Sequence, residues 1–194
     1  MTTQCLLLHP VHFLILSGKV ERKNLSCKQK AVFLDRDGTI NEYVGFLRNI
    51  EEMRLIDGSA EAIRHINQQG YLAVVVTNQP VLARGDVTWD ELDEIHAKME
   101  TLLGQQGAYL DAIYLCPHHP DNGFEGEVVE LKIDCDCRKP KPGLLFQAAK
   151  DFNIDLENSW MVGDSEVDVQ AGKQAGCRTI LLKKTLVEAV EQIG

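Results

Sequence analysis

Two aspartates stand two positions apart where an apolar run of the chain ends. Asp35 closes the run AVFLD (31–35), and Asp37 follows two positions later. The first carboxylate of such a pair can attack phosphorus, and the second can carry a proton to the leaving group. EF-hand calcium loops also use Asp-x-Asp-Gly, but the twelfth position of such a loop would be Phe46 instead of a glutamate. A solvated acidic turn is the remaining alternative.

Two further segments carry groups that could hold a phosphate. Thr77 and Asn78 end the apolar run YLAVVVTN (71–78), and their hydroxyl and amide could bind phosphate oxygens, although Thr-Asn is also a common turn sequence. Arg138 and Lys139 open the run RKPKPG directly before an expected helix. Cations at a helix N-terminus oppose the helix dipole, and a bound phosphate would resolve that conflict. The alternative is a basic helix entry without a ligand.

A third segment, GDSEVD (163–168), places Asp164 directly after another apolar run. Carboxylate oxygens are suitable ligands for a hard divalent cation such as Mg²⁺. An acid at this place could equally cap the N-terminus of the following helix. Asp164 is distant in sequence from Asp35, so a cation site shared by the two requires the fold to bring them together.

Three of the six cysteines cluster with histidine. Cys116 lies just before His118 and His119, and Cys135 and Cys137 follow after a loop. Three thiolates and one imidazole make the closed tetrahedral set that binds structural zinc. A disulfide or inert buried thiols are the alternatives. The clustering with histidine favours zinc in a reducing compartment.

Short apolar runs alternate with amphipathic stretches along the main part of the chain. We expect strands over 31–35, 71–78, 111–116, 159–164 and 177–182, and helices over 58–69, from 88 onwards, over 144–152 and over 166–175. Thr88 and Glu91 match the capping box that begins many helices. This alternation predicts an α/β fold with a mostly parallel sheet. Ligands of such sheets bind at the carboxyl ends of the strands, where Asp35, Thr77 and Asp164 would meet.

The composition is that of one acidic globular domain. The chain has 194 residues, 44% of them hydrophobic, and a net charge of −9. An acidic surface repels nucleic acid and anionic membranes, so we expect neither as a partner, and no apolar run is long enough to span a bilayer. We assign 30–194 to the domain and 1–29 to an N-terminal extension.

The apolar run at 5–16 lies within that extension and resembles part of a signal peptide. It lacks preceding basic residues and a clear cleavage site after it. We therefore expect a strand or short helix packed on the domain, or a poorly ordered extension.

The chemistry-bearing motifs, in this order, resemble those of the haloacid-dehalogenase-like (HAD) phosphatases. This resemblance implies a Rossmann-like HAD fold in which Asp35 forms an aspartyl-phosphate and Asp37 serves as general acid and base. It implies that Thr77 and Lys139 hold the phosphate. It also implies Mg²⁺ bound by the Asp35 and Asp164 carboxylates and the Asp37 backbone carbonyl. Magnesium and Lys139 would offset the repulsion between these acids and phosphate.

A narrower resemblance involves the runs FLDRDGTIN, VVVTNQ and CPHHP followed by CDCRKPKPG. These are similar to the D-glycero-D-manno-heptose 1,7-bisphosphate phosphatases, and the related histidinol-phosphate phosphatases share the zinc device with a shorter loop. Because these families have Cys-x-His at this place, the resemblance favours His118 over His119 as the zinc ligand. The resemblance thus implies a zinc-binding loop over 116–137, with Cys116, His118, Cys135 and Cys137 as ligands.

The same resemblance implies a set of substrate contacts near the proposed nucleophile. They are Tyr43, Val44, Gly45, Phe46, Thr77, Asn78, Gln79, Pro80, Arg138, Lys139 and Ser165. Two positions depart from the family pattern. Pro80 stands where these enzymes often have serine, and Ser165 stands where they can carry lysine. Both departures concern substrate contacts, so the chemical groups are intact.

The spacing of the motifs limits what can cover the site. Asp35 and Thr77 are 42 positions apart, and Thr77 and Lys139 are 62 apart, which leaves no room for a separate cap domain. We therefore expect the loop at 41–50 and the zinc-binding loop to shape the mouth.

We predict a magnesium-dependent phosphomonoesterase of carbohydrate metabolism with a structural zinc, acting on a sugar bisphosphate whose distal phosphate is held by Arg138. A cytoplasmic monomer is expected. Histidinol-phosphate phosphatase is the alternative within this class, and a non-catalytic phosphate-binding module is the alternative outside it. The intact Asp35, Asp37, Lys139 and Asp164 argue against a pure binder, which needs no proton shuttle.

Overall fold

The protein is described by a computed structural model that covers residues 28–121, 123 and 125–193. The prediction for the apolar run at 5–16 lies outside the described residues. The strands are β1 (Ala31–Leu34), β2 (Leu72–Asn78), β3 (Ala112–Cys116), β4 (Trp160–Gly163) and β5 (Arg178–Leu181). The α-helices are α1 (Ser59–Gln68), α2 (Trp89–Gly104), α3 (Gly143–Phe152), α4 (Glu166–Ala175) and α5 (Leu186–Val190). Three single-turn 3₁₀ helices complete the set: η1 (Ile50–Glu52), η2 (Val129–Leu131) and η3 (Leu156–Asn158).

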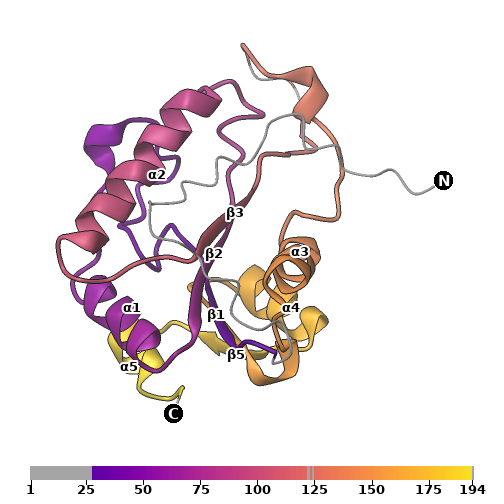
Figure 1. Cartoon of the computed structure of the whole chain (residues 1–194). Coiled ribbons are helices and arrows are strands. Elements are labelled where there is room, and N and C mark those ends of the chain that lie inside the picture. Colours follow the sequence, from indigo (N-terminus) through magenta and orange to yellow (C-terminus); the bar gives the residue numbers. More distant parts are fainter. Residues whose placement is uncertain (1–27, 122, 124, 194) are drawn as a thin grey trace.

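The five strands form one parallel sheet in the order β3-β2-β1-β4-β5. This confirms the α/β fold with a parallel sheet that the sequence predicts. The central strand β1 pairs Leu34 with Val75 of β2 on one side and with Val162 of β4 on the other. Figure 1 shows the sheet running through the middle of the molecule.

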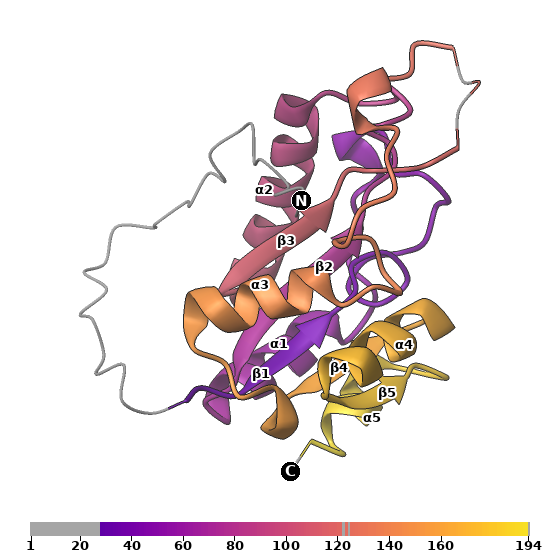
Figure 2. The same ribbon diagram turned by 90° about the vertical axis from the view of Figure 1, so that its right-hand side faces the viewer.

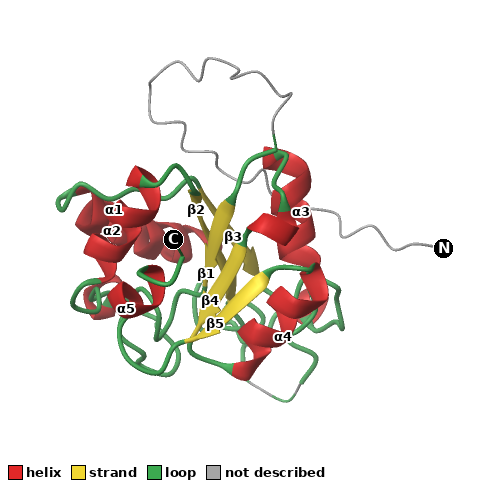
Figure 3. Cartoon of the chain, turned by 90° about the horizontal axis from the view of Figure 1, so that it is seen from below, coloured by secondary structure: helices red, strands yellow, loops and turns green. Residues whose placement is uncertain are grey.

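Helices cover both faces of the sheet, so the molecule has three layers (Figure 3). Successive strand residues point to opposite faces, and β1 shows this within four residues. Val32 and Leu34 belong to the core under α1, α2 and α5, whereas Ala31 and Phe33 belong to the core under α3 and α4. A strand that is buried on both faces has to be apolar throughout, which explains the unbroken run in the sequence.

The expected elements begin and end within about one residue of their predicted bounds. At the start of α2, Thr88 accepts a hydrogen bond from the Glu91 backbone and the Glu91 side chain returns one to Thr88, so the predicted capping box is confirmed. The sequence analysis missed α5, a helix of five residues. Thr185 caps it by accepting from the Glu188 backbone N–H, so the same Thr-x-x-Glu signal was present there.

The strand order creates a crevice where the site is expected. From β1 the chain moves outward to β2 and β3, and it then crosses back to place β4 on the other side of β1. Connections that leave neighbouring strands in opposite directions open a gap at the carboxyl ends of those strands. Figure 2 shows the strands running in one direction. Asp35 directly follows β1, Thr77 lies near the end of β2, and Asp164 directly follows β4, so all three lie at the carboxyl ends of the strands.

The connections between β1 and β2 and between β2 and β3 are too short to contain a second domain. The β1–β2 and β2–β3 connections each hold one α-helix, and the first also holds η1. The loop that follows β3 rests on the loop that follows β2, because the Val128 N–H donates to the Ala83 carbonyl at 3.0 Å. Within the part of the chain that the structure describes, none of the helices has the length and apolar character needed to cross a bilayer.

Candidate active site

A pocket of about 320 Å³ opens at the carboxyl ends of the strands. All the predicted catalytic, magnesium-binding and substrate-contacting residues except Val44 line it: Asp35, Asp37, Tyr43, Gly45, Phe46, Thr77, Asn78, Gln79, Pro80, Arg138, Lys139, Asp164 and Ser165. Val44 lies outside the lining and is exposed to solvent. Leu47, Val81, Val167 and Asp168 also line the pocket, and the sequence analysis assigned no role to them.

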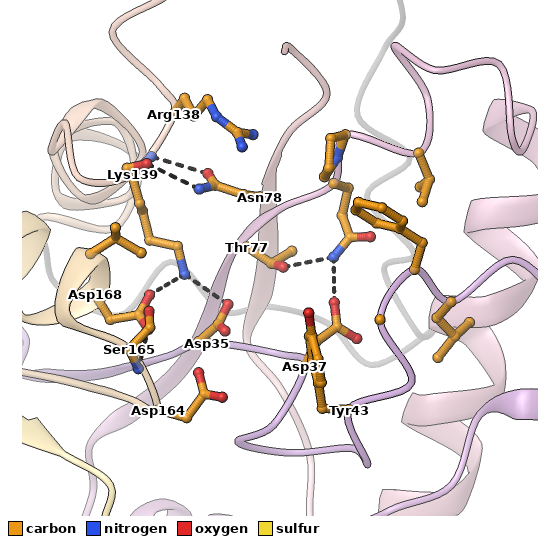
Figure 4. A pocket seen from close by; sticks show the side chains of 17 residues that line it. Asp35, Asp37, Tyr43, Thr77, Asn78, Arg138, Lys139, Asp164, Ser165 and Asp168 are labelled. Atoms are coloured by element: carbon orange, nitrogen blue, oxygen red, sulfur yellow. Dashed lines mark hydrogen bonds and ion pairs between the residues drawn. The ribbon is translucent and has the colours of Figure 1, made fainter. Parts of the chain in front are cut away.

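Asp35 is fixed by the sheet itself. It is the first residue after β1, and its backbone N–H donates to the Val162 carbonyl of β4 at 3.0 Å. Its carboxylate Oδ1 lies 2.7 Å from the Lys139 Nζ (Figure 4). Burial raises the pKa of Asp35 to about 6, and the Lys139 charge limits that rise. The Lys139 cation therefore favours the ionised form of this carboxylate, which is the form that a nucleophile needs.

Lys139 is a buried cation held between two acids. Its Nζ contacts Asp35, Asp168 at 2.5 Å and the Val76 carbonyl at 2.8 Å. Burial would lower the pKa of Lys139, but the two carboxylates outweigh that effect and raise it. Its backbone is held as well, because Asn78 accepts from the Lys139 N–H at 3.0 Å and donates to its carbonyl at 3.1 Å. Asn78 therefore positions the lysine in addition to lining the pocket.

Asp37 is surrounded by hydrogen-bond donors. Arg36 donates to both of its carboxylate oxygens, at 2.8–3.1 Å, while Asn41 donates to one oxygen at 3.0 Å and Gln79 to the other at 2.8 Å. Burial would raise the pKa of Asp37, but the Arg36 charge and these donors lower it instead. Its side chain keeps one-fifth of its surface exposed, and Asp37 lines the pocket. The carboxylate is thus held in one orientation with one side open to a ligand.

Two further acids lie near Asp35, and their oxygens together offer a place for a hard cation. Ligand oxygens of Asp35, Asp164 and Asp168 lie within 4.8 Å of one another. Glycine at position 38 lets the turn after β1 lie close to Asp164 as that side chain is oriented here, since a Cβ would lie 2.2 Å from an Asp164 oxygen. Gly38 also has a φ of 81°, which side chains disfavour. This all-oxygen donor set fits magnesium.

The predicted zinc ligands converge at the start of the loop after β3. Neighbouring ligand atoms of Cys116, His118, Cys135 and Cys137 lie 3.2–3.7 Å apart. A tetrahedral site with bonds of about 2.3 Å has edges of about 3.8 Å, so the cluster fits zinc with small adjustments. The His118 Nδ1 points at the thiols, whereas the His119 Nδ1 accepts from the Asp121 N–H at 3.2 Å.

Known proteins share this chain's sequence and fold. A HAD-hydrolase-like family model matches residues 136–189, which include Lys139 and Asp164. The D-glycero-β-D-manno-heptose-1,7-bisphosphate 7-phosphatase of Pasteurella multocida is 46% identical over 157 residues, which is 81% of this chain and 83% of that protein. The enzyme of the same name from Escherichia coli K12 is 43% identical over 80% of this chain and 79% of its own length.

Solved structures agree with the sequence comparison. The D,D-heptose 1,7-bisphosphate phosphatase of B. bronchiseptica, complexed with magnesium and phosphate, is 37% identical with a TM-score of 0.71, covering 86% of this chain and 87% of that one. A HAD-like phosphatase from Mesorhizobium loti is 33% identical with a TM-score of 0.76, over 86% of this chain and 88% of that one. The chain belongs to the D-glycero-β-D-manno-heptose-1,7-bisphosphate 7-phosphatase family. The HAD phosphatase resemblance stated from the motifs is thereby confirmed.

The two departures from the heptose bisphosphate phosphatase pattern occupy different places. Pro80 lines the pocket at the start of the loop that follows β2. Ser165 caps α4, where its hydroxyl donates to the Asp168 carboxylate at 2.5 Å and its backbone N–H donates to the same carboxylate at 3.2 Å. Ser165 therefore helps to orient the acid that holds Lys139.

Sequence reasoning missed three buried residues of this site. Asp168, which is 1% exposed, forms an ion pair with Lys139 in addition to the one that Asp35 forms. Arg36 is completely buried beside Asp37, and His96 of α2 contacts the Arg36 guanidinium. Asp168 stood within the acidic segment already singled out, whereas the spacing of Arg36 and His96 along the chain carries no signal of their contact.

Proposed function

We propose that this chain is a magnesium-dependent phosphatase that removes the 7-phosphate of D-glycero-β-D-manno-heptose 1,7-bisphosphate through an aspartyl-phosphate on Asp35. One observation carries the proposal. The Asp35 carboxylate lies in the pocket with Lys139 at 2.7 Å and Asp164 nearby, in a chain that belongs to the heptose bisphosphate phosphatase family.

The first chemical step is attack by an Asp35 carboxylate oxygen on the phosphorus. The bond from phosphorus to the sugar oxygen breaks, and Asp37 gives a proton to that oxygen. Because the donors around Asp37 lower its pKa in the free protein, its acid form has to arise in the substrate complex, where the negative charge of the phosphate favours protonation. Lys139 and Thr77 bind the phosphate oxygens during transfer. The Thr77 hydroxyl already accepts from Gln79 at 2.8 Å, which leaves its own proton available for a phosphate oxygen.

The second step releases phosphate and restores the enzyme. Asp37, now ionised, takes a proton from a water molecule as that water attacks the phosphorus of the aspartyl-phosphate, and the Asp35 carboxylate leaves. The Asp35 and Asp164 carboxylates and the Asp37 carbonyl would hold Mg²⁺. When bound, the cation offsets the negative charge that builds up on the transferred group.

Other residues of the chain are assigned to substrate binding and to a structural metal site. Arg138 lines the pocket and is assigned to the distal 1-phosphate, while the exposed Tyr43 and Phe46 border the sugar. The cluster of Cys116, His118, Cys135 and Cys137 is assigned to a structural zinc. The zinc assignment requires reduced thiols, which supports a cytoplasmic enzyme, and a monomer is proposed with it.

The test is phosphate release with Mg²⁺ from a panel of phosphomonoesters. The panel contains both anomers of heptose 1,7-bisphosphate, other sugar bisphosphates and histidinol phosphate. We expect the β-anomer to have the highest kcat/KM, with phosphorus NMR showing that the 1-phosphate remains on the product. Asp35→Asn should lower kcat at least about 10³-fold, because the amide is a far weaker nucleophile.

Two other results would change the assignment. Preference for histidinol phosphate would move the chain to the related branch while retaining the same chemistry. Turnover of no phosphomonoester by magnesium-loaded protein would refute the enzyme and favour a phosphate-binding module.

A further inference from the structure

His96 is a buried histidine with no part in the proposed steps. It lies on the inner face of α2, is 7% exposed, and its Nε2 lies 3.1 Å from Nη1 of Arg36. Burial and the Arg36 charge lower the pKa of His96 to about 3. The imidazole is therefore neutral at physiological pH, and because guanidinium only donates hydrogen bonds, Nε2 is the acceptor and the ring proton is on Nδ1.

The guanidinium of Arg36 has a partner on each of its three nitrogens. Nε and Nη2 donate to the Asp37 carboxylate, Nη2 also donates to Gln79 at 3.0 Å, and Nη1 faces His96. Arg36 is 0% exposed, so bulk water does not solvate this charge. A buried donor without an acceptor is costly, and His96 supplies the acceptor on the side away from Asp37.

Gln79 closes the arrangement from the end of β2. Its amide NH₂ donates to Asp37 and to Thr77, each at 2.8 Å, and its amide oxygen accepts from Arg36. Only 2% of Gln79 is exposed. Its hydrogen bonds are thus directed at neighbouring side chains, which makes it part of the support of Asp37.

We propose that His96 is a positioning residue for proton transfer, because it fixes the Arg36 guanidinium that, with Gln79, holds the Asp37 carboxylate toward the leaving oxygen of the substrate. The proposal rests on the proposed phosphatase function. His96 contacts neither substrate nor the reacting atoms. It acts from a helix on one face of the sheet, through Arg36, on a group whose orientation decides how fast the sugar oxygen is protonated.

A histidine that serves only as core packing would behave differently. Its replacement by any side chain of similar volume that preserves the fold would leave turnover unchanged. A positioning histidine instead requires an acceptor at the end of the side chain. His96→Leu fills the space without an acceptor, whereas His96→Gln retains an amide oxygen that can accept from Arg36.

The experiment compares the wild type, His96→Leu and His96→Gln in steady-state assays with magnesium and heptose 1,7-bisphosphate. Met99→Leu serves as the matched control, because Met99 is a fully buried residue on the same helix. Thermal unfolding is followed for each variant, and assays are run well below the lowest midpoint. His96→Met provides a second variant without a comparable acceptor if His96→Leu does not fold.

We expect His96→Leu to lower kcat about tenfold or more with KM within twofold of wild type, since binding of the phosphate does not involve His96. His96→Gln should recover most of that kcat, and Met99→Leu should resemble wild type. Equal kcat in His96→Leu and wild type would overturn the proposal. So would an equal loss in the Leu and Gln variants, or a change confined to KM. Wild-type protein without turnover would instead refute the phosphatase function itself.

Discussion

The two buried cations of the site, Arg36 and Lys139, each lie between acceptors from different segments. Lys139 connects Asp35 to Asp168, and Arg36 connects Asp37 to His96. A buried charge without a partner costs several kcal/mol, so each cation constrains the side chains around it. The two catalytic carboxylates are consequently fixed by different cations, and their environments differ. The pKa of Asp35 is raised by burial, whereas the donors around Asp37 lower its pKa.

The neutral His96 predicts how stability responds to acid. Its pKa falls from 6.5 to about 3 on folding, so below pH 6.5 the unfolded chain binds a proton that the folded chain does not. The contribution of His96 to stability is present above pH 6.5 and is lost as pH falls toward 3, with a slope of up to about 1.4 kcal/mol per pH unit.

Denaturant unfolding of wild type and His96→Gln at pH 7, 6 and 5 measures this effect. The free energy of unfolding should fall more steeply with acidification in the wild type, because glutamine does not titrate. Parallel curves for the two proteins would show that His96 binds a proton as readily in the folded chain as in the unfolded chain.

At the scale of elements, the loop after β3 connects the thiol cluster to the pocket. Cys137 is followed directly by Arg138 and Lys139, and Arg138 Nη1 donates to the His118 carbonyl at 3.1 Å. The cluster thus lies directly before the segment that provides Arg138 and Lys139. A metal that ties its four ligands together would fix the backbone from which Arg138 reaches the pocket.

Disruption of the cluster should therefore weaken substrate binding. We expect Cys135→Ala to bind less than one zinc per chain and to raise KM for the bisphosphate about tenfold, because Arg138 loses its fixed position. Cys177→Ala is the matched control, since this buried thiol lies outside the cluster. Metal analysis and steady-state kinetics measure both effects. A Cys135 variant with full activity and no zinc would show that substrate binding does not depend on the metal.

On the scale of the whole molecule, β1 contributes to the cores on both faces of the sheet. Its four residues are completely buried, it pairs with β2 and β4, and its end carries Asp35. The segment before it is also anchored, because Gln29 pairs with residues on both sides of Ile154 through backbone hydrogen bonds of 2.7 and 3.0 Å. The contacts that define the domain thus begin at the start of the described chain.

A chain that begins at Lys28 should accordingly fold and work by itself. We expect its thermal midpoint to stay within about 3 °C of the full chain, with unchanged kcat, because the sheet and both cores are intact. A chain that begins at Asp35 lacks β1 and should fail to fold. Circular dichroism with assays of both proteins tests the boundary between 1–29 and 30–194. If the chain that begins at Lys28 failed to fold, the residues before it would have to be counted as part of the domain.

Local patterns in the sequence determined most of the sheet and its helices. The unbroken run from Leu72 to Val76 predicts a strand buried on both faces, and the Thr88–Glu91 pair predicts where α2 begins. Such signals depend on neighbours a few positions apart, which the sequence displays directly. The acids at strand ends were predictable for the same reason, because parallel strands deliver their carboxyl ends to one edge.

Only the tertiary structure decided which side chains touch. His96 and Arg36 are 60 positions apart and meet because α2 packs on the face of the sheet to which Val32 and Leu34 point, with His96 buried. Gln79, expected at the substrate, lines the pocket and also bonds Asp37, Thr77 and Arg36 within the protein. Such contacts depend on strand order and on the rotation of a helix about its axis. Those are properties of long-range packing, and residue spacing along the chain does not encode them.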